Sequence, residues 1–134
     1  MTKKFLFVLL LALPLAAFPS KTGLMPGVYE VLTSLDGAAP EKSRSCITPE
    51  AADVGYVPPP PSPDCRISRS TFAGGRIDVL QVCKNATVVI SGSYTATSLV
   101  MDEKLQVKTP KETVTSASHS VAKRVGDTCK GDED

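Results

Sequence analysis

The chain has 134 residues, of which 42% are apolar, 22% charged and 5% aromatic. This length and apolar content indicate one small globular domain and exclude a disordered chain. Fifteen basic and 14 acidic residues give a net charge of +1, so the charge balance favours no nucleic-acid partner. A single histidine excludes a metal site built from several histidines.

The N-terminus has the layout of a secretory signal peptide. A short basic start precedes an almost unbroken apolar run over residues 5–15, and the small residues Ala16 and Ala17 follow. The run is about half the ~20 residues that a membrane span needs. We expect a signal peptide over 1–17, with cleavage after Ser20 as the alternative and an uncleaved anchor as the competing interpretation. The mature protein is then periplasmic or secreted and has no membrane span.

After cleavage, we expect a linker over 18–25, an antiparallel β domain over 26–130 and an acidic tail over 131–134. Strand-like runs rich in β-branched residues dominate this domain, and no sustained helical period occurs. Thr48 is expected to cap one short helical turn that begins a surface loop over 49–64, which contains Pro58–Pro61. The predicted strands cover residues 27–35, 43–47, 65–72, 76–83, 87–97, 98–101, 104–109 and 114–125.

This pattern predicts an all-β fold, with one small antiparallel sheet that is strongly curved or half-barrel-like, or a small sandwich. The alternation over 87–97 places every second residue on one largely apolar face. That face is either core or a binding surface, because a curved sheet without helices must cover its concave side. The candidate apolar ligand face comprises Val88, Ile90, Tyr94, Leu99, Met101 and Val121.

Four cysteines in a small exported chain indicate two disulfides. Gly74-Gly75 lies midway between Cys65 and Cys83, and strand-like runs flank it. A three-residue turn centred on Gly74 would place these two cysteines directly opposite each other, within disulfide range. We therefore predict Cys65–Cys83 and, by exclusion, Cys46–Cys129. A structural zinc site or a reactive thiol is the competing interpretation, although the chain has no C-x-x-C pair.

The polar candidates for catalysis do not converge. His119 has Ser116, Ser118 and Ser120 as sequence neighbours, but adjacent strand residues point to opposite faces, so we expect a partly exposed strand histidine. Asp102-Glu103 are adjacent acids, and we expect them in a solvated turn between two strands rather than facing one reaction site.

Three further motifs have ordinary structural interpretations. Asn85-Ala86-Thr87 matches a glycosylation sequon, but we expect Asn85 to form the turn after Cys83. Pro58–Pro61 resembles a polyproline recognition segment and is more typical of a surface linker. Gly126-Asp127 resembles a phosphate-binding turn only superficially, since the chain has no P-loop motif.

Four patterns, taken in order, resemble the bacterial exported family known as the domain of unknown function 3617 family. They are residues 26–31 (PGVYEV), residues 46–50 (CITPE), the Cys65-to-Cys83 hairpin with Gly75, and residues 124–129 (RVGDTC). The resemblance covers about residues 26–130, with Thr128 inside the last motif and the proline run as departures. It implies an exported location and this type of fold, and it implies no chemistry because the family has no established activity.

We therefore expect a non-catalytic exported binding or interaction module for a hydrophobic ligand or an envelope partner, with no cofactor. The alternative is a structural or stress-protective envelope protein without a discrete ligand. An enzyme is the third hypothesis. The sequence disfavours it, because no acid, base, nucleophile or metal cluster converges.

Overall fold

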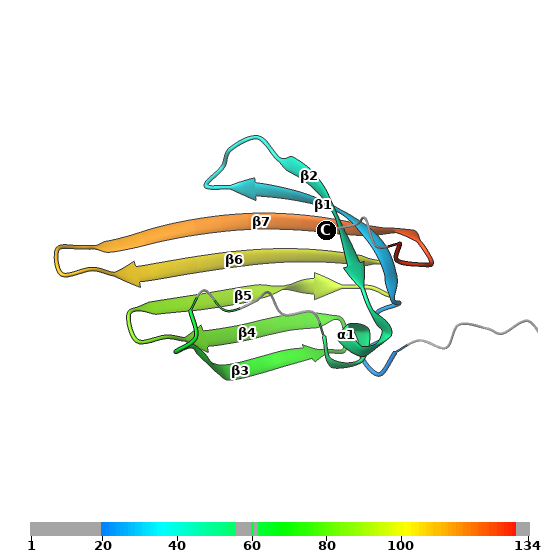
Figure 1. Cartoon of the computed structure of the whole chain (residues 1–134), viewed down its shortest axis with the longest axis horizontal. Coiled ribbons are helices and arrows are strands. Elements are labelled where there is room, and N and C mark those ends of the chain that lie inside the picture. The colour runs from blue at the N-terminus through cyan, green and yellow to red at the C-terminus, as the bar shows by residue number, and fades with distance from the viewer. Residues whose placement is uncertain (1–19, 56–59, 61, 131–134) are drawn as a thin grey trace, which may run out of the picture.

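The computed structural model describes residues 20–55, 60 and 62–130, and in them seven strands form one antiparallel sheet (Figure 1). The strand order is β2-β1-β7-β6-β5-β4-β3, and β2 and β3 are its two unpaired edges. The predicted all-β class is confirmed. The strands are β1 Gly27–Leu35, β2 Glu41–Ile47, β3 Arg66–Ala73, β4 Arg76–Val82, β5 Ala86–Tyr94, β6 Ser98–Lys108 and β7 Thr113–Gly126.

The sheet is open and strongly curved, and its inner face carries the core. Alternate residues of the central strands are buried there, as the period of two requires. The buried inner-face residues are Tyr29, Phe72, Ile77, Val79, Val88, Ile90, Tyr94, Leu99 and Ala122. The outer face carries the intervening residues, which are half-buried or exposed.

One end of the curved sheet is closed by the helix α1, Pro49–Val54, and by residues 20–25. Thr48 caps α1 as predicted, because its hydroxyl accepts a hydrogen bond of 3.1 Å from the amide of Ala51. Leu24 is fully buried, and the Tyr94 hydroxyl donates a 2.7 Å hydrogen bond to the carbonyl of Thr22. Residues 20–25 are thus a packed part of the domain, which corrects the expectation of a linker over 18–25.

The β3–β4 hairpin contains the predicted cysteine pair, but its turn and its register differ from those expected. Its turn has two residues, Gly74 and Gly75, with φ of 61° and 79°, so the expected three-residue turn is wrong. A regular ladder that starts at the Ala73–Arg76 pair would place Cys65 opposite Lys84 rather than opposite Cys83. A β-bulge between Ile67 and Arg69 absorbs the extra residue and brings the two cysteines back into opposition.

Both predicted disulfides are confirmed, which leaves no free cysteine and excludes the zinc interpretation. The Cα atoms are 4.0 Å apart in Cys65–Cys83 and 5.6 Å apart in Cys46–Cys129. The two bridges close loops with sequence separations of 18 and 83 residues. The disputed chain-entropy treatment assigns them ~3 and ~4.5 kcal/mol of stabilisation.

The expected turn at Asp102-Glu103 is wrong, because β6 runs unbroken from Ser98 to Lys108 through both acids. Asp102 pairs with Ser91 of β5 on the outer face, and Glu103 pairs with Ile90 on the inner face. The two carboxylates therefore lie on opposite sides of the sheet. The predicted signal peptide and acidic tail, and most of Pro58–Pro61, lie outside the described residues.

Gly55 ends α1 where the helix meets the sheet, with φ of 91°, and a Cβ built there would lie 2.5 Å from the Phe72 ring. Gly37 in the β1–β2 turn has a similar φ of 76° and nothing within 4 Å of its Cβ position. Both Gly→Ala changes incur a positive-φ backbone cost of about 1 kcal/mol or more. Gly55→Ala should lose about 1 to 3 kcal/mol more, from overpacking.

Urea unfolding followed by circular dichroism measures this difference. Equal losses in the two variants would mean that α1 does not pack on Phe72 as described.

Candidate functional site

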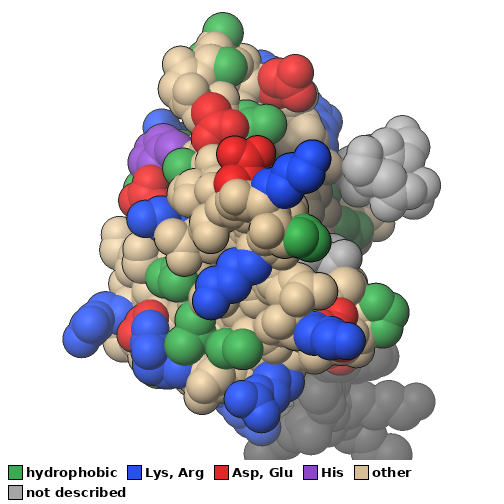
Figure 2. All heavy atoms as spheres, turned by 90° about the vertical axis from the view of Figure 1, so that its left-hand side faces the viewer, with side chains coloured by type: hydrophobic (Ala, Val, Ile, Leu, Met, Phe, Trp, Pro, Cys, Tyr) green, Lys and Arg blue, Asp and Glu red, His purple; other side chains and the backbone are tan. Residues whose placement is uncertain are grey.

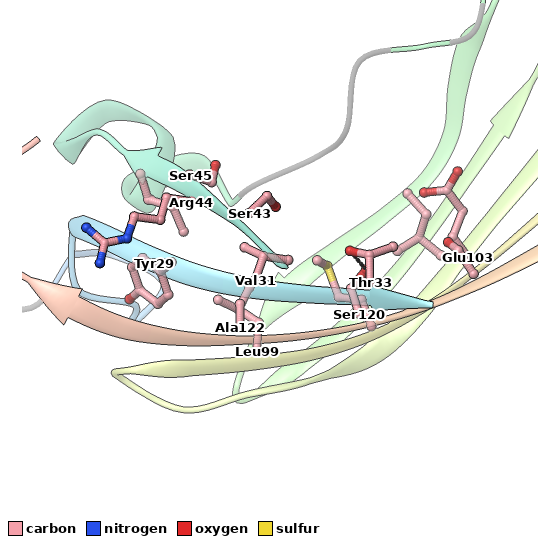
Figure 3. Close-up of a pocket in the computed structure, with 14 residues that line it drawn as sticks. Tyr29, Val31, Thr33, Ser43, Arg44, Ser45, Leu99, Glu103, Ser120 and Ala122 are labelled. Carbon is pink, nitrogen blue, oxygen red and sulfur yellow. Dashed lines mark hydrogen bonds between the residues drawn. The ribbon is translucent and has the colours of Figure 1, made fainter. Parts of the chain in front are cut away.

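A cavity of about 320 Å³ lies between β2 and the inner face of the sheet (Figure 3). This volume is at the small end of the ~300 to 1,000 Å³ range of ligand pockets. Side chains from five strands line it. They are Tyr29, Val31 and Thr33 of β1, Ser43, Arg44, Ser45 and Ile47 of β2, Ile90 of β5, Leu99, Met101 and Glu103 of β6, and Ser118, Ser120 and Ala122 of β7.

The lining changes from apolar to polar along the strands. Ile47, Leu99 and Ala122 are buried near the end that α1 closes, and Val31 and Met101 continue the apolar floor. Hydroxyl groups follow on the same face, where Thr33 and Ser120 lie 3.0 Å apart, oxygen to oxygen, in a cross-strand hydrogen bond. The cavity is therefore mainly apolar toward one end, where Arg44 and Ser45 of β2 are its polar members, and presents hydroxyl groups toward the other.

Three of the six residues predicted for the apolar ligand face line this cavity, namely Ile90, Leu99 and Met101. Val88 and Tyr94 are buried on the same inner face but belong to the core beside it.

Val121 lies on the outer face, where it pairs with Leu32 and Val100, so its predicted inward orientation is wrong. Val125, also an odd-numbered residue of β7, is 52% exposed. Ser118, Ser120 and Ala122 are the β7 residues that face the cavity, and hydropathy alone does not mark the two serines as inner.

Tyr29 fixes the closed end of the cavity and was missed as a site residue. Its side chain is fully buried, and its hydroxyl donates a 2.6 Å hydrogen bond to the carbonyl of Met25. Burial raises the pKa of this phenol, and the positive charge of Arg124 opposes part of that rise. The hydroxyl therefore stays protonated at neutral pH and acts as a structural donor.

β2 covers the cavity, yet among the described strands it pairs with β1 alone. The Cys46–Cys129 disulfide attaches the far end of β2 to the segment after β7, and α1 follows β2 directly. The seven-residue strand is thereby held at one end, whereas its exposed start near Glu41 connects to the β1–β2 turn. β2 is consequently the part of the cavity wall that depends most on a covalent link.

His119 is half-exposed on the outer face of β7, as expected, and its two neighbouring serines, Ser118 and Ser120, line the cavity on the other face. Its Nδ1 lies 2.7 Å from a carboxylate oxygen of Asp102. This cross-strand hydrogen bond was missed, because the acids were assigned to a turn. Asn85 lies in the β4–β5 turn as predicted, and its carbonyl accepts a 2.8 Å hydrogen bond from the amide of Lys108.

Charged side chains of both signs cover one end of the sheet. Figure 2 shows Lys and Arg side chains over both halves of this face, with most of the acidic side chains and the histidine in the upper half. Lys84 in the β4–β5 turn and Lys108 beside the β6–β7 turn belong to this end, since the two turns are hydrogen-bonded to each other. These charges lie on exposed turns, whereas side chains from five strands converge on the cavity. The cavity is therefore the better candidate for a binding site.

Within the described ranges, no group of three or more His, Cys, Asp or Glu side chains could hold a metal ion. Over the same residues, no helix is long and apolar enough to cross a membrane. The two disulfides indicate an oxidising compartment outside the cytoplasm.

A family described as "Protein of unknown function (DUF3617)" matches residues 24–129. The chain belongs to this family. The match begins at the buried Leu24 and ends at Cys129, so the DUF3617 domain includes all seven strands, both disulfides and the cavity. Neither the search of curated proteins nor that of solved structures returned a match.

Replacing Cys46 and Cys129 by serine should release the end of β2 and open the cavity. We expect the β2 amides that pair with β1 to exchange at least tenfold faster with solvent deuterium. The matched control, Cys65→Ser with Cys83→Ser, removes a bridge at the opposite edge and should leave β2 as protected as the rest of the sheet. Unchanged β2 protection in the first variant would contradict the assigned role of the bridge.

Proposed function

We propose that this protein is an exported, non-catalytic binding module that holds a small, largely apolar ligand in the cavity under β2. The cavity itself supports this proposal. About half of its lining residues are apolar, and hydroxyl groups converge at one end. Concave, mainly apolar sites with a few placed polar groups are the usual form of small-molecule sites.

Export is supported by two independent features. The N-terminal basic and apolar segments have the order of a signal peptide. All four cysteines of the remaining chain are paired in disulfides, which persist in the periplasm or outside the cell.

A binding role is favoured over catalysis by how the reactive groups are arranged. His119 and Asp102, which form the kind of hydrogen-bonded pair that a general base would use, lie on the outer face, away from the cavity. The cavity lining holds hydroxyls, one guanidinium and one carboxylate. Among the described residues, none of these hydroxyls has a base within hydrogen-bond distance to activate it.

Native mass spectrometry of the mature protein, purified without detergent, tests this proposal. We expect an added mass of a few hundred daltons that is lost on denaturation, or uptake of 1-octanol by protein that emerges bare. A bare mass together with no uptake of 1-octanol would contradict a binding role.

A cavity-filling variant locates the ligand. Ser120→Phe should occupy the space between β7 and β2 and reduce 1-octanol binding at least tenfold. Val121→Phe places the same ring on the adjacent residue but on the outer face, and should bind as the wild type does. Titration followed by NMR shifts of the Met101 methyl group measures both affinities. Equal loss in the two variants would place the ligand elsewhere.

A further inference from the structure

Glu103 is an unusual member of the cavity lining. It lies on the inner face of β6, a central strand, directly opposite Ile90 of β5 and Ser118 of β7. Met101 and Leu105, two residues away on either side, share that face and are partly buried against the core. Glu103 itself is only partly exposed. A carboxylate is therefore placed among apolar side chains on the concave side of the sheet.

No cation of the chain neutralises this carboxylate in the described residues. The ion pairs there involve Glu30, Asp78, Asp102 and Asp127, and no hydrogen bond reaches the Glu103 side chain. Lys104 is adjacent in sequence, but its side chain is exposed on the outer face. A partly desolvated carboxylate without a partner is unfavourable, so a cation bound beside it gains more than it would in water.

The other charge on the cavity lies at the opposite end. Figure 3 shows the Arg44 guanidinium near Tyr29, whereas Glu103 lies beyond Thr33 and Ser120. Arg44 is exposed on the edge strand β2, where it pairs in register with Glu30. The end of the cavity that presents hydroxyls and a carboxylate is thus separate from the end that presents a guanidinium.

We propose that the ligand carries a protonated amine, which binds Glu103 while its apolar part lies on Val31, Leu99 and Met101. This inference rests on the proposed function and specifies its ligand class as a cationic amphiphile. An ammonium group has three donors. One pairs with the Glu103 carboxylate, and the hydroxyls of Ser118 and Ser120, on the same face of the neighbouring strand, can accept the others.

The cavity volume determines the probe. At ~30 Å³ for each water-sized group, 320 Å³ accommodates about ten non-hydrogen atoms. 1-Octylamine, 1-octanol and octanoate all have this size and share one alkyl chain, and they carry a positive, a neutral and a negative head group. Comparing the three isolates the contribution of the head-group charge.

The test is a titration of the mature protein with each probe by calorimetry or NMR. The wild type should bind 1-octylamine about tenfold more tightly than 1-octanol, and octanoate most weakly. Glu103→Gln should remove the preference for the amine and leave 1-octanol affinity within about twofold, which also verifies that the variant folds. Asp102→Asn, the matched control, removes the adjacent carboxylate on the outer face and should retain the preference.

A second variant reverses the charge: Glu103→Lys should favour octanoate over 1-octylamine. Equal wild-type affinities for amine and alcohol would overturn the inference and leave the cavity proposal intact. Tighter binding of octanoate by the wild type would overturn it in favour of the Arg44 end. Absence of binding by all three probes would instead contradict the proposed function.

Discussion

The described residues form a single sheet with an apolar inner face and contribute little else that could cover it. The described residues hold one helix, α1, of six residues. The sheet therefore curves, and its own edge strand β2 lies over the inner face. At one end, α1 and residues 20–25 complete the burial of Tyr29, Phe72 and Tyr94. At the other end the covering is incomplete, and the cavity remains.

The covalent links are placed where this arrangement is weakest. Cys65–Cys83 lies at the outer edge hairpin, and Cys46–Cys129 holds the strand that covers the cavity. An edge strand with one partner has half the backbone hydrogen bonds of a central strand, so its position needs another restraint. In an oxidising compartment that restraint is permanent, which keeps the cavity formed in the absence of a ligand and lowers the ordering cost of binding.

Local signals predicted most of the fold. The strand over residues 27–35 matches β1, and the Thr48 cap and both disulfides follow from residue types and spacing. No residue type marks the β3 bulge in the sequence. The correct Cys65–Cys83 pairing was therefore predicted from a three-residue turn that the structure does not contain. Asp102-Glu103 resembles a turn in sequence, but β6 runs through both acids, with Asp102 exposed on the outer face and Glu103 partly exposed on the inner face. Half of the predicted ligand face lines the cavity. The serines of the cavity, Tyr29 and Glu103 were not predicted as lining residues, because their orientation depends on strand register and sheet curvature.

A crystal structure of the mature protein soaked with 1-octanol tests whether the space under β2 receives an apolar group. We expect ligand density between β2 and the inner face, in contact with Val31, Leu99 and Met101. Density confined to the outer face, or β2 collapsed onto β6 with no space between them, would contradict it.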